Sequence, residues 1–493
     1  MDVEAALAVA LALAAVPALA LPGGAAEQGV DASADVPPQP HGPIQGDAEF
    51  ELPTAVNGVR SGSGTAEDPY VISDWVIAPS TTFAIRIFDT DAHVRIDTIL
   101  VRGQGCPTDS GATCDLTGLD LRGADNVTVE DVRVLGAGRG LHATDVEHLT
   151  IRRSAFGLAT ETPFVVTSEG LDIHFSRDVE VANVTSVAVF PLVLTRSENA
   201  TFHDVTLLGD PAAAESLATT FDPAVTGDDA RNVSFVRTDV VDVNAFLGGE
   251  RGDTEFVHSR FLRGAGHGFS EGSNDATFDS LFVCGSTFRD VPDEALDVSD
   301  VENLTIEGNV FTNNTDAVTT SLADENVTVV RNRVENQSST GLAIGGHDIT
   351  VHNNSLANNG GRGFLEGHDL SPTDADNPTD ARFNWWGHED GPNVTVSGSD
   401  EILNPSPGDQ LVVDAVDEVD WSDWLSQPPE VGPDAVDCGV PAGEPGADRG
   451  PDLDVAFQAE LAIEVTVDEQ LGPTHVRAEA EAVGETALDA DAG

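Results

Sequence analysis

The sequence predicts an all-β chain that folds as a solenoid of short strands. The first observation behind this prediction is a motif that recurs about every 22 residues along the chain. The second is the alternation of apolar and polar residues inside each copy of the motif, and the third is that no helix-period stretch separates the copies. Alternation with a period of two is typical of strands, and a fixed period of roughly 20 to 50 residues is typical of stacked repeats.

The strongest copies of the motif lie in the second half of the chain. Each copy begins with a small polar residue and continues as apolar–Thr–apolar. Two polar positions and then an apolar residue end the copy. Thr305, Thr328 and Thr350 are separated by 23 and 22 residues. The clearest copies are VEHLTIRRSAF (146–156), VENLTIEGNVF (301–311), ENVTVVRNRV (325–334) and HDITVHNNSL (347–356).

Leucine-rich repeats have a similar length, but their Leu/Asn consensus and helical half are missing here. The remaining architecture is a parallel β-helix, in which three short strands form a coil and coils stack at the strand spacing of about 4.8 Å. We expect roughly ten to eleven coils. Asn309, Asn332 and Asn354 keep the repeat spacing, so they should form an inward polar ladder whose members hydrogen-bond along the column.

Composition excludes several classes of function. The chain has 85 acidic residues against 23 basic ones, which are all arginines, and a net charge of −62. This charge repels nucleic acid, so we expect no nucleic-acid partner. The acidic residues are spread along the whole chain, and molar salt screens their mutual repulsion. We therefore expect a protein adapted to high salt.

The N-terminus predicts export. Residues 5–20 form an apolar run that ends in Ala18-Leu19-Ala20, which is the pattern of a signal peptide and its cleavage site, although Asp2 and Glu4 stand where basic residues are usual. No apolar stretch long enough to span a membrane follows. Of the four cysteines, Cys106 and Cys114 flank a short loop and are the candidates for a disulfide. The expected location is extracellular or at the cell surface.

Three further segments resemble the right-handed parallel β-helix proteins of the pectate-lyase-like superfamily. They are SGSGTAEDPYVISDWVI (61–77), FNWWGHEDGP (383–392) and GDQLVVDAVDEVDWSDWLSQP (408–428). The resemblance implies a right-handed parallel β-helix with a C-terminal cap built by Trp385, Trp386, Trp421 and Trp424. The implied organisation is a signal peptide at 1–20, a flexible linker at 21–57, the β-helix at 58–392, the cap at 393–429 and an acidic tail with one or two short strands at 430–493.

One row of polar residues is the candidate catalytic site. In the register of the repeat, the position before a small turn residue is occupied by His267, Glu294, Asp316 and Arg362 on successive coils. An acid, a base and a cation on one face are the groups that general acid–base catalysis needs. The alternative is a solvated polar face without chemistry. Asp228-Asp229 with Gly266-His267-Gly268 also resembles the site of pectin-hydrolysing relatives, although their Arg-x-Lys element has no counterpart in a chain without lysine.

Two other kinds of site have candidates. Asp293, Asp297 and Asp300 lie close together in an acidic stretch and are candidate Ca²⁺ ligands, although no cofactor is required by the sequence. Asn336, Asn353 and Asn393 begin Asn-x-Ser/Thr sequences and are candidate glycosylation sites.

Three functions fit these features. The first is a monomeric, non-catalytic protein that binds extracellular or cell-surface polysaccharide. The second is a lyase or hydrolase that acts on acidic glycans through the polar row. The third, implied by the resemblance, is a NosD-like accessory protein for copper-enzyme assembly.

Overall fold

The computed structural model describes most of the chain up to residue 439 and two short strands beyond it. The described residues are 39–46, 58–79, 82–103, 116–158, 168–209, 224–247, 252–264, 266–271, 278–321, 324–366, 379–398, 401–413, 419–439, 464–466 and 477–479. The chain divides into two units, Met1–Gly439 and Val440–Gly493. In the second unit, β43 (Glu464–Thr466) and β44 (Arg477–Glu479) pair as antiparallel strands.

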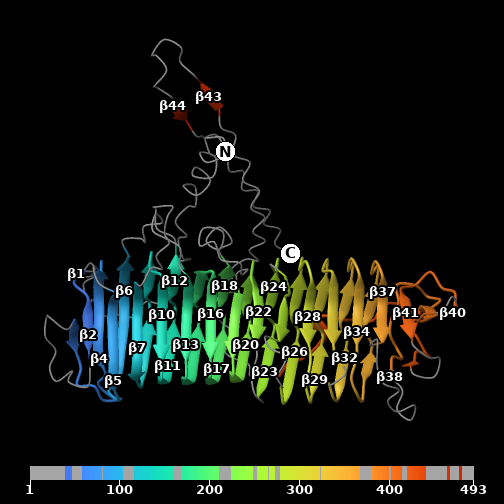
Figure 1. Ribbon diagram of the computed structural model, residues 1–493, viewed down its shortest axis with the longest axis horizontal. Helices are drawn as coiled ribbons and strands as arrows, with labels where there is room; N and C mark the ends of the chain where they lie inside the picture. The colour runs from blue at the N-terminus through green and yellow to red at the C-terminus, as the bar shows by residue number, and fades with distance from the viewer. Residues whose placement is uncertain are drawn as a thin grey trace, which may run out of the picture. The chain divides into compact units, whose positions relative to one another are not determined.

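The unit Met1–Gly439 is built from two long sheets, one of 16 strands and one of 26 strands (Figure 1). Each typical coil gives one strand to the 16-stranded sheet and two strands to the 26-stranded sheet. The strands of the 16-stranded sheet, in spatial order, are β2 (Ile44–Gly46), β5 (Phe83–Thr90), β7 (Thr117–Ala124), β10 (Arg139–Thr144), β13 (Glu169–His174), β16 (Phe190–Thr195), β19 (Ala224–Asp228), β22 (Asn244–Leu247), β25 (Phe269–Glu271), β28 (Glu294–Val298), β31 (Asp316–Thr320), β34 (Thr340–Ile344), β37 (Arg362–Glu366), β41 (Gln410–Val413), β39 (Asn393–Val396) and β40 (Ile402–Asn404).

The 26-stranded sheet supplies the other two sides of the coil. Its first group of strands is β1 (Gln39–His41), β3 (Val59–Ser61), β4 (Tyr70–Ile77), β6 (Val94–Arg102), β8 (Val127–Glu130), β11 (Glu147–Arg152), β14 (Arg177–Ala182), β17 (Glu198–His203), β20 (Arg231–Val236), β23 (Asp253–Val257), β26 (Ser280–Cys284), β29 (Leu304–Glu307), β32 (Val327–Val330), β35 (Thr350–His352), β38 (Thr379–Asp380) and β42 (Val419–Asp420). Its second group is β9 (Arg133–Leu135), β12 (Ala155–Leu158), β15 (Thr185–Ala188), β18 (Thr206–Gly209), β21 (Asp239–Val241), β24 (Arg260–Leu262), β27 (Thr287–Arg289), β30 (Val310–Thr312), β33 (Arg333–Glu335) and β36 (Ser355–Ala357).

These strands confirm the predicted parallel β-helix. Neighbouring coils pair in parallel and in the register of the repeat, as where Ile306 lies opposite Val329 and Val329 opposite Val351. Among the described residues, the one helical element is the 3₁₀ turn η2 (Pro433–Ala435), and no helix is long and apolar enough to cross a membrane.

Inward-facing apolar residues fill the coils and stack in columns. The rings of Phe261, Phe288 and Phe311 follow one another with centroids 4.6 and 4.9 Å apart, which is close to the spacing of the strands themselves. A side chain that repeats in every coil therefore packs on its own copy. This stacking explains why the hydrophobic columns are visible as a repeat in the sequence.

The three asparagines expected to form a ladder lie in one buried column. The Asn332 side-chain oxygen accepts hydrogen bonds from the Asn309 backbone N–H at 2.8 Å and from its side-chain amide at 3.0 Å. Asn354 receives the same pair of bonds from Asn332, and Asn384 extends the column. Toward the N-terminus, Ser286 and Ser259 take the same position with shorter side chains. Each turn backbone is thus held by the side chain of the next coil.

The glycines of the Gly-x-Gly turns are required because adjacent coils approach closely. A Cβ atom on Gly140 would lie 2.4 Å from the backbone oxygen of Gly170, and one on Gly268 would lie 2.4 Å from that of Ala295. Left-handed backbone is instead provided mainly by Asp and Asn at other turns, for example Asn232 and Asn326 with φ of 54° and 50°.

The β-helix extends beyond both of its expected ends. Residues 39–46, inside the range expected to be a flexible linker, form β1 and β2, which pair in parallel with β4 and β5. At the other end, β41 pairs in parallel with β37, and β42 pairs with β38. These segments carry no clear copy of the motif, so the repeat alone did not reveal them. The 16-stranded sheet has thirteen successive strands from β2 to β37, one for each coil, whereas ten to eleven coils were expected.

Four tryptophans lie at the C-terminal end. Trp386 is fully buried, and the Trp385 backbone bonds to both Asn354 and Leu356 of the last regular coil. The rings of Trp421 and Trp424 stack 5.9 Å apart, and both pack against the core.

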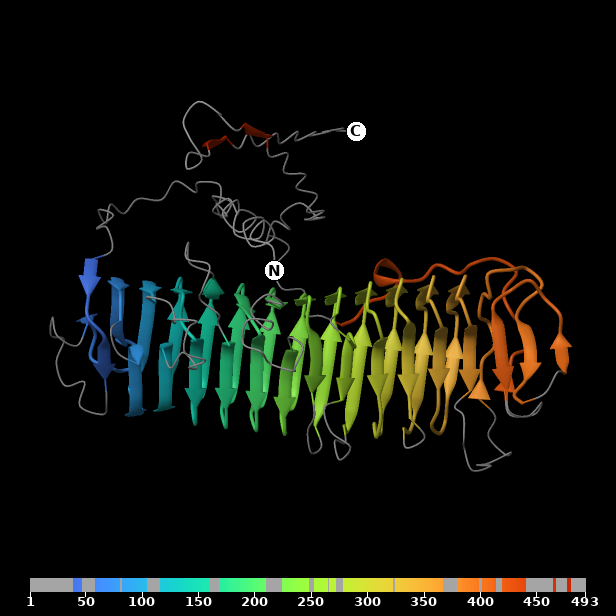
Figure 2. The same ribbon diagram turned by 45° about the horizontal axis from the view of Figure 1, so that its top comes forward.

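The segment from Val431 to Cys438, which we call the strap, lay inside the expected tail but docks on the β-helix. It follows β42 and runs back over coils already formed (Figure 2). Gly432 N–H donates to the Arg331 backbone oxygen at 3.1 Å, and a Cβ atom on Gly308 would lie 2.3 Å from Val436. Cys438 then forms a disulfide with Cys284. The predicted pair, Cys106 and Cys114, lies outside the described residues.

Candidate functional site

The outward face of the 16-stranded sheet carries an unusual buried carboxylate. On β13, Leu171 and Ile173 face the core, so the alternation of the strand turns Asp172 and His174 outward. An outward residue is normally exposed, yet Asp172 is 3% exposed. Its hydrogen-bonding partners come from β10 and from β13 itself. We call Arg139, His142, Glu169, Asp172 and His174 the Asp172 cluster.

Both oxygens of Asp172 bind an imidazole. His142 Nδ1 lies 2.7 Å from Asp172 Oδ2, and His174 Nε2 donates to Asp172 Oδ1. The second nitrogen of His142 lies 3.0 Å from the Thr144 hydroxyl. Among the described residues, the hydrogen bonds of His174 involve only Nε2, which leaves Nδ1 as its acceptor atom when the ring is neutral. Arg139 Nε forms an ion pair with Glu169 and lies 3.7 Å from Asp172 Oδ2.

These contacts move two pKa values in opposite directions. Burial alone would raise the pKa of Asp172, but the hydrogen bonds from His142 and His174 outweigh it and hold the pKa well below its usual value. The hydrogen bond to Asp172 raises the pKa of His174, and burial of the ring opposes this effect. Asp172 therefore stays ionised, and it makes His174 a stronger base.

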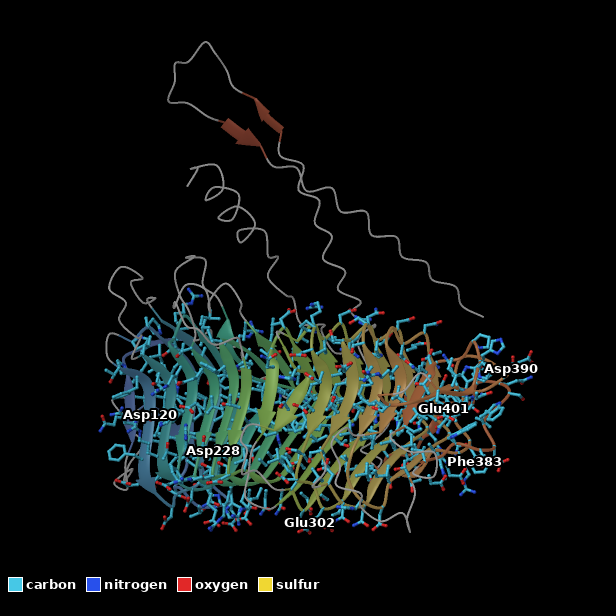
Figure 3. The ribbon with its side chains drawn as sticks, turned by 45° about the vertical axis from the view of Figure 1, so that its right-hand side comes forward. Asp120, Asp228, Glu302, Phe383, Asp390 and Glu401 are labelled. Atoms are coloured by element: carbon cyan, nitrogen blue, oxygen red, sulfur yellow. A yellow bond between two sulfur atoms is a disulfide. The ribbon has the colours of Figure 1, made fainter. Side chains whose placement is uncertain are left out.

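The preceding coils continue the same pattern. Asp120 lies opposite His142 in the register of β7 and β10, and its side chain is 1% exposed. Arg86 and Arg122 bind its two carboxylate oxygens at 2.6 and 2.7 Å. Figure 3 labels Asp120 near the end of the β-helix that carries the first coils.

Around Asp120 and the Asp172 cluster this face is balanced in charge, although the chain as a whole is strongly acidic. Asp120, Glu169 and Asp172 are matched by three arginines and accompanied by two histidines; the arginines are Arg86, Arg122 and Arg139. Aromatic rings lie beside them: Arg86 lies 4.1 Å from the Phe83 ring centroid, and Phe175, which is 48% exposed, follows His174. Arginines beside aromatic rings offer groups that can pair with carboxylates and contact apolar surfaces.

The predicted catalytic row exists as a column but not as a single contact site. His267 Nδ1 lies 3.0 Å from Glu294 Oε2, and Glu294 lies opposite Asp316 in the register. The Asp316 carboxylate accepts a hydrogen bond from the Thr340 backbone. Arg362 lies opposite Thr340 on the next strand. At about 4.8 Å per coil, Arg362 is too far from His267 for both to act on one atom.

The predicted Ca²⁺ ligands divide between two places. Asp293 lies beside His267 and Glu294, and ligand atoms of these three residues lie within 4.8 Å of one another. Asp297 is on the same strand as Glu294, with its Oδ2 3.5 Å from the Ser270 hydroxyl. Asp300 lies in the turn after β28, where its backbone N–H bonds to Ser321. We call His267, Asp293, Glu294 and Asp297 the Glu294 cluster.

Two carboxylates of the Glu294 cluster, Glu294 and Asp297, have pKa shifts opposite to that of Asp172. Burial raises the pKa of Glu294, and the hydrogen bond with Asp293 raises it further. Burial also raises the pKa of Asp297, while the charge of His267 opposes the rise.

The acidic pair of the hydrolase resemblance is not assembled with His267. Asp228 ends β19, which lies two strands from β25, and Figure 3 labels it between Asp120 and Glu302 along the length of the β-helix. Asp229 forms an ion pair with Arg196 at 3.2 Å.

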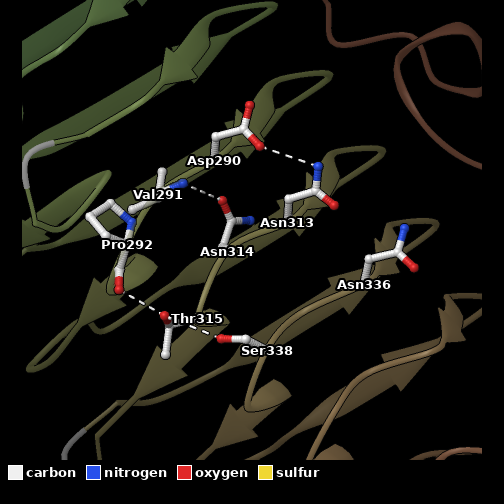
Figure 4. A pocket seen from close by; sticks show the side chains of 8 residues that line it. All are labelled: Asp290, Val291, Pro292, Asn313, Asn314, Thr315, Asn336 and Ser338. Atoms are coloured by element: carbon white, nitrogen blue, oxygen red, sulfur yellow. Dashed lines mark hydrogen bonds between the residues drawn. The ribbon is translucent and has the colours of Figure 1, made fainter.

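A shallow pocket lies on the turns beside β27, β30 and β33 (Figure 4). Its polar groups bind one another: Asn313 donates to Asp290 at 3.2 Å, and the Thr315 hydroxyl donates to the Pro292 backbone oxygen at 2.7 Å. Asn336, one of the candidate glycosylation sites, lies at this pocket and is exposed. Asn353 is exposed in a different turn, between β35 and β36, and Asn393 is half-buried in β39.

The Asp172 cluster was not predicted from the sequence. The sequence pattern that could have revealed the cluster is Leu171-Asp172-Ile173-His174, in which ionisable residues alternate with core residues. Placing His142 beside Asp172 needs the register between β10 and β13, whose partners are 30 residues apart rather than 22.

The parallel coils and their ladder define a solenoid protein that presents long, flat outer faces. Residues 244–368 match the family described as the right-handed beta helix region, and the chain is a right-handed parallel β-helix protein. Among solved structures, the A-module of a mannuronan C-5 epimerase from Azotobacter vinelandii is similar, with 10% identity, a TM-score of 0.32, and coverage of 70% of this chain and 83% of that one. The Dettilon tailspike protein is similar at 12% identity and a TM-score of 0.32, and the match covers 70% of this chain and 59% of the tailspike. A search of curated proteins found no match.

Proposed function

We propose that this chain is an exported, salt-adapted protein that binds an acidic polysaccharide on the outer face of the 16-stranded sheet and cleaves it by β-elimination at the Asp172 cluster. The observation that carries the proposal is the buried carboxylate of Asp172, which orients two imidazoles beside Arg139 on an outward face. Non-catalytic binding through the same face is the alternative function.

Binding follows from the local balance of charge. An acidic polymer is repelled by a chain with a net charge of −62, so it needs a surface where arginines offset the acids. The described residues supply one around Arg86, Arg122 and Arg139. These arginines lie on adjacent strands, so their spacing of about 4.8 Å per coil suits a polymer that carries a carboxylate on each sugar.

The chemistry follows from the position of His174. A uronate carries a weakly acidic C–H beside its carboxylate, and Arg139 is placed to neutralise the charge that develops on that carboxylate when the proton leaves. His174 Nδ1 takes the proton, because Nε2 is committed to Asp172. The C–H electron pair forms a C=C bond, the neighbouring C–O bond breaks, and the departing sugar oxygen takes a proton from water. Asp172 is a positioning residue in this scheme.

Export is supported by the disulfide between Cys284 and Cys438, because disulfides persist in oxidising compartments outside the cytosol. Salt adaptation is supported by the dispersed acidic excess. At molar ionic strength the Debye length is about 3 Å, which screens repulsion between acids on neighbouring coils.

The test is an assay of the full chain in molar salt against a panel of uronate-containing polysaccharides. We expect ultraviolet absorbance from unsaturated uronates, reduced at least 100-fold in His174→Gln and Arg139→Gln. The matched control is His148→Gln, an exposed histidine on the other sheet that faces Asp178. Retention of the wild-type chain on one polysaccharide without turnover, lost in Arg139→Gln, would reduce the function to binding. Neither turnover nor retention would reject the proposal.

The pH dependence provides a second test. His174 must be neutral to take a proton, and its pKa is raised by Asp172. The value of kcat/KM should therefore rise with pH, with its acid limb above the usual histidine value of about 6.5. Asp172→Asn should move this limb toward lower pH, and an unmoved limb would mean that His174 is not the base.

A further inference from the structure

The Glu294 cluster lies on the same face of the sheet but has no part in the proposed reaction. His267 precedes β25 and Glu294 begins β28, and the two strands are adjacent. The Gly268 backbone N–H donates to the Glu294 backbone oxygen at 3.0 Å, so the main chain fixes the relative position of the two residues. Asp293 Oδ2 lies 4.0 Å from His267 Nε2, and Glu294 Oε2 lies 3.0 Å from Nδ1 of the same ring.

The negative charge of this cluster is not matched by the nearby arginines. Arg260 forms an ion pair with Asp239, Arg263 with Asp242, and Arg289 with Asp290. Three carboxylates therefore share one histidine in the described part of these coils. Glu294 and His267 are only about one-quarter exposed, at 25% and 28% of their side chains, so water screens their charges incompletely.

We propose that His267, Asp293 and Glu294 bind one divalent transition-metal ion of the Zn²⁺ type. The three side chains offer one nitrogen and two carboxylate oxygens within 4.8 Å of one another, which is the donor set and the compactness that such ions use. Ca²⁺ takes six to eight oxygen ligands and does not use imidazole, so the histidine selects against it. Solvent occupies the remaining coordination positions.

The Asp172 cluster does not compete for the same ion. Both oxygens of Asp172 and three of the four imidazole nitrogens around it are held in hydrogen bonds. Arg139 also lies 3.7 Å from Asp172 and repels a cation. Metal binding at the Glu294 cluster is therefore independent of the proposed reaction.

The test uses the full chain, treated with chelator and dialysed into molar NaCl, which suppresses diffuse binding to the acidic surface. Co²⁺ is added as a spectroscopic probe, and Zn²⁺ and Ca²⁺ are used as competitors. We expect one Co²⁺ per chain with a visible absorption band, displacement by Zn²⁺, and at least 100-fold weaker displacement by Ca²⁺. His267→Gln and Glu294→Gln should each weaken Co²⁺ binding at least tenfold.

Asp300→Asn is the matched control, because it removes a nearby acid outside the cluster and should change the affinity less than twofold. Equal binding by wild type, His267→Gln and Glu294→Gln would overturn the proposal, as would equal competition by Ca²⁺ and Zn²⁺. Far-ultraviolet circular dichroism of each variant checks that the β-helix is intact. If His267→Gln does not fold, Asp293→Asn provides the same comparison.

Discussion

The Asp172 cluster and the Glu294 cluster occupy the same outward face of the same sheet and are built from the same residue types. In the first, two imidazoles hydrogen-bond a carboxylate and lower its pKa. In the second, burial raises the pKa of two carboxylates that share one imidazole. The charged form of the carboxylate is therefore stabilised in the first cluster and disfavoured in the second.

The difference arises from the neighbouring coils. Arg86, Arg122 and Arg139 project from β5, β7 and β10 beside the first cluster. In the coils around the second, Arg260 and Arg289 belong to β24 and β27, on another side of the coil. In a repeat fold the register fixes the position of a side chain, while the residues of the neighbouring coils determine its electrostatic environment.

The largest effect that separates the two regions should come from the disulfide. It joins residues 154 positions apart and ties the strap only to the coils of the Glu294 side. Cys284→Ser with Cys438→Ser should lower the free energy of unfolding by about 4 kcal/mol. Hydrogen exchange should accelerate in β26 to β36 much more than in β7 to β15; uniform acceleration would contradict the regional effect.

Removing one carboxylate from each cluster should have unequal effects. Asp172→Asn weakens the hydrogen bonds of two imidazoles around a side chain that is 4% exposed, and should cost about 3 kcal/mol. Asp297→Asn replaces a carboxylate whose charged form is disfavoured by burial, so stability at neutral pH should be unchanged or higher. Denaturant unfolding in molar salt with chelator measures the free energy of unfolding of both variants. Equal losses of stability in Asp172→Asn and Asp297→Asn would contradict the electrostatic difference between the two clusters.

The smallest effect should be the pH dependence of these two substitutions. The lowered pKa of Asp172 gives stability that is present above its unfolded-state value of about 4 and is lost as pH falls through the folded-state pKa. The raised pKa of Asp297 gives the opposite sign, with stability lost as pH rises above about 4. From pH 7 toward pH 3, the penalty of Asp172→Asn should shrink, and so should any gain from Asp297→Asn. Parallel changes in both variants would contradict the assigned shifts.

The sequence predicted features that depend on one coil resembling the next. Asn332 was placed in a ladder because its spacing to Asn309 and Asn354 equals the repeat, and the inward apolar columns followed in the same way. His142 and Asp172 were not paired because an insertion between their coils breaks the period. The disulfide between Cys284 and Cys438 was also missed, because the strap carries no repeat and runs back over coils that precede it in sequence.

The strap runs back along the β-helix, so a segment that is synthesised late is bonded to a coil that was synthesised 154 residues earlier. Between β42 and Cys438 the strap docks on the turns after β32 and β29 through Gly432 and Val436, and Cys438 then bonds to Cys284 in β26. Terminal repeats of a solenoid normally open one by one. Here the strap joins β26 to the turns after β29 and β32, so we expect these coils to open together once the disulfide has formed.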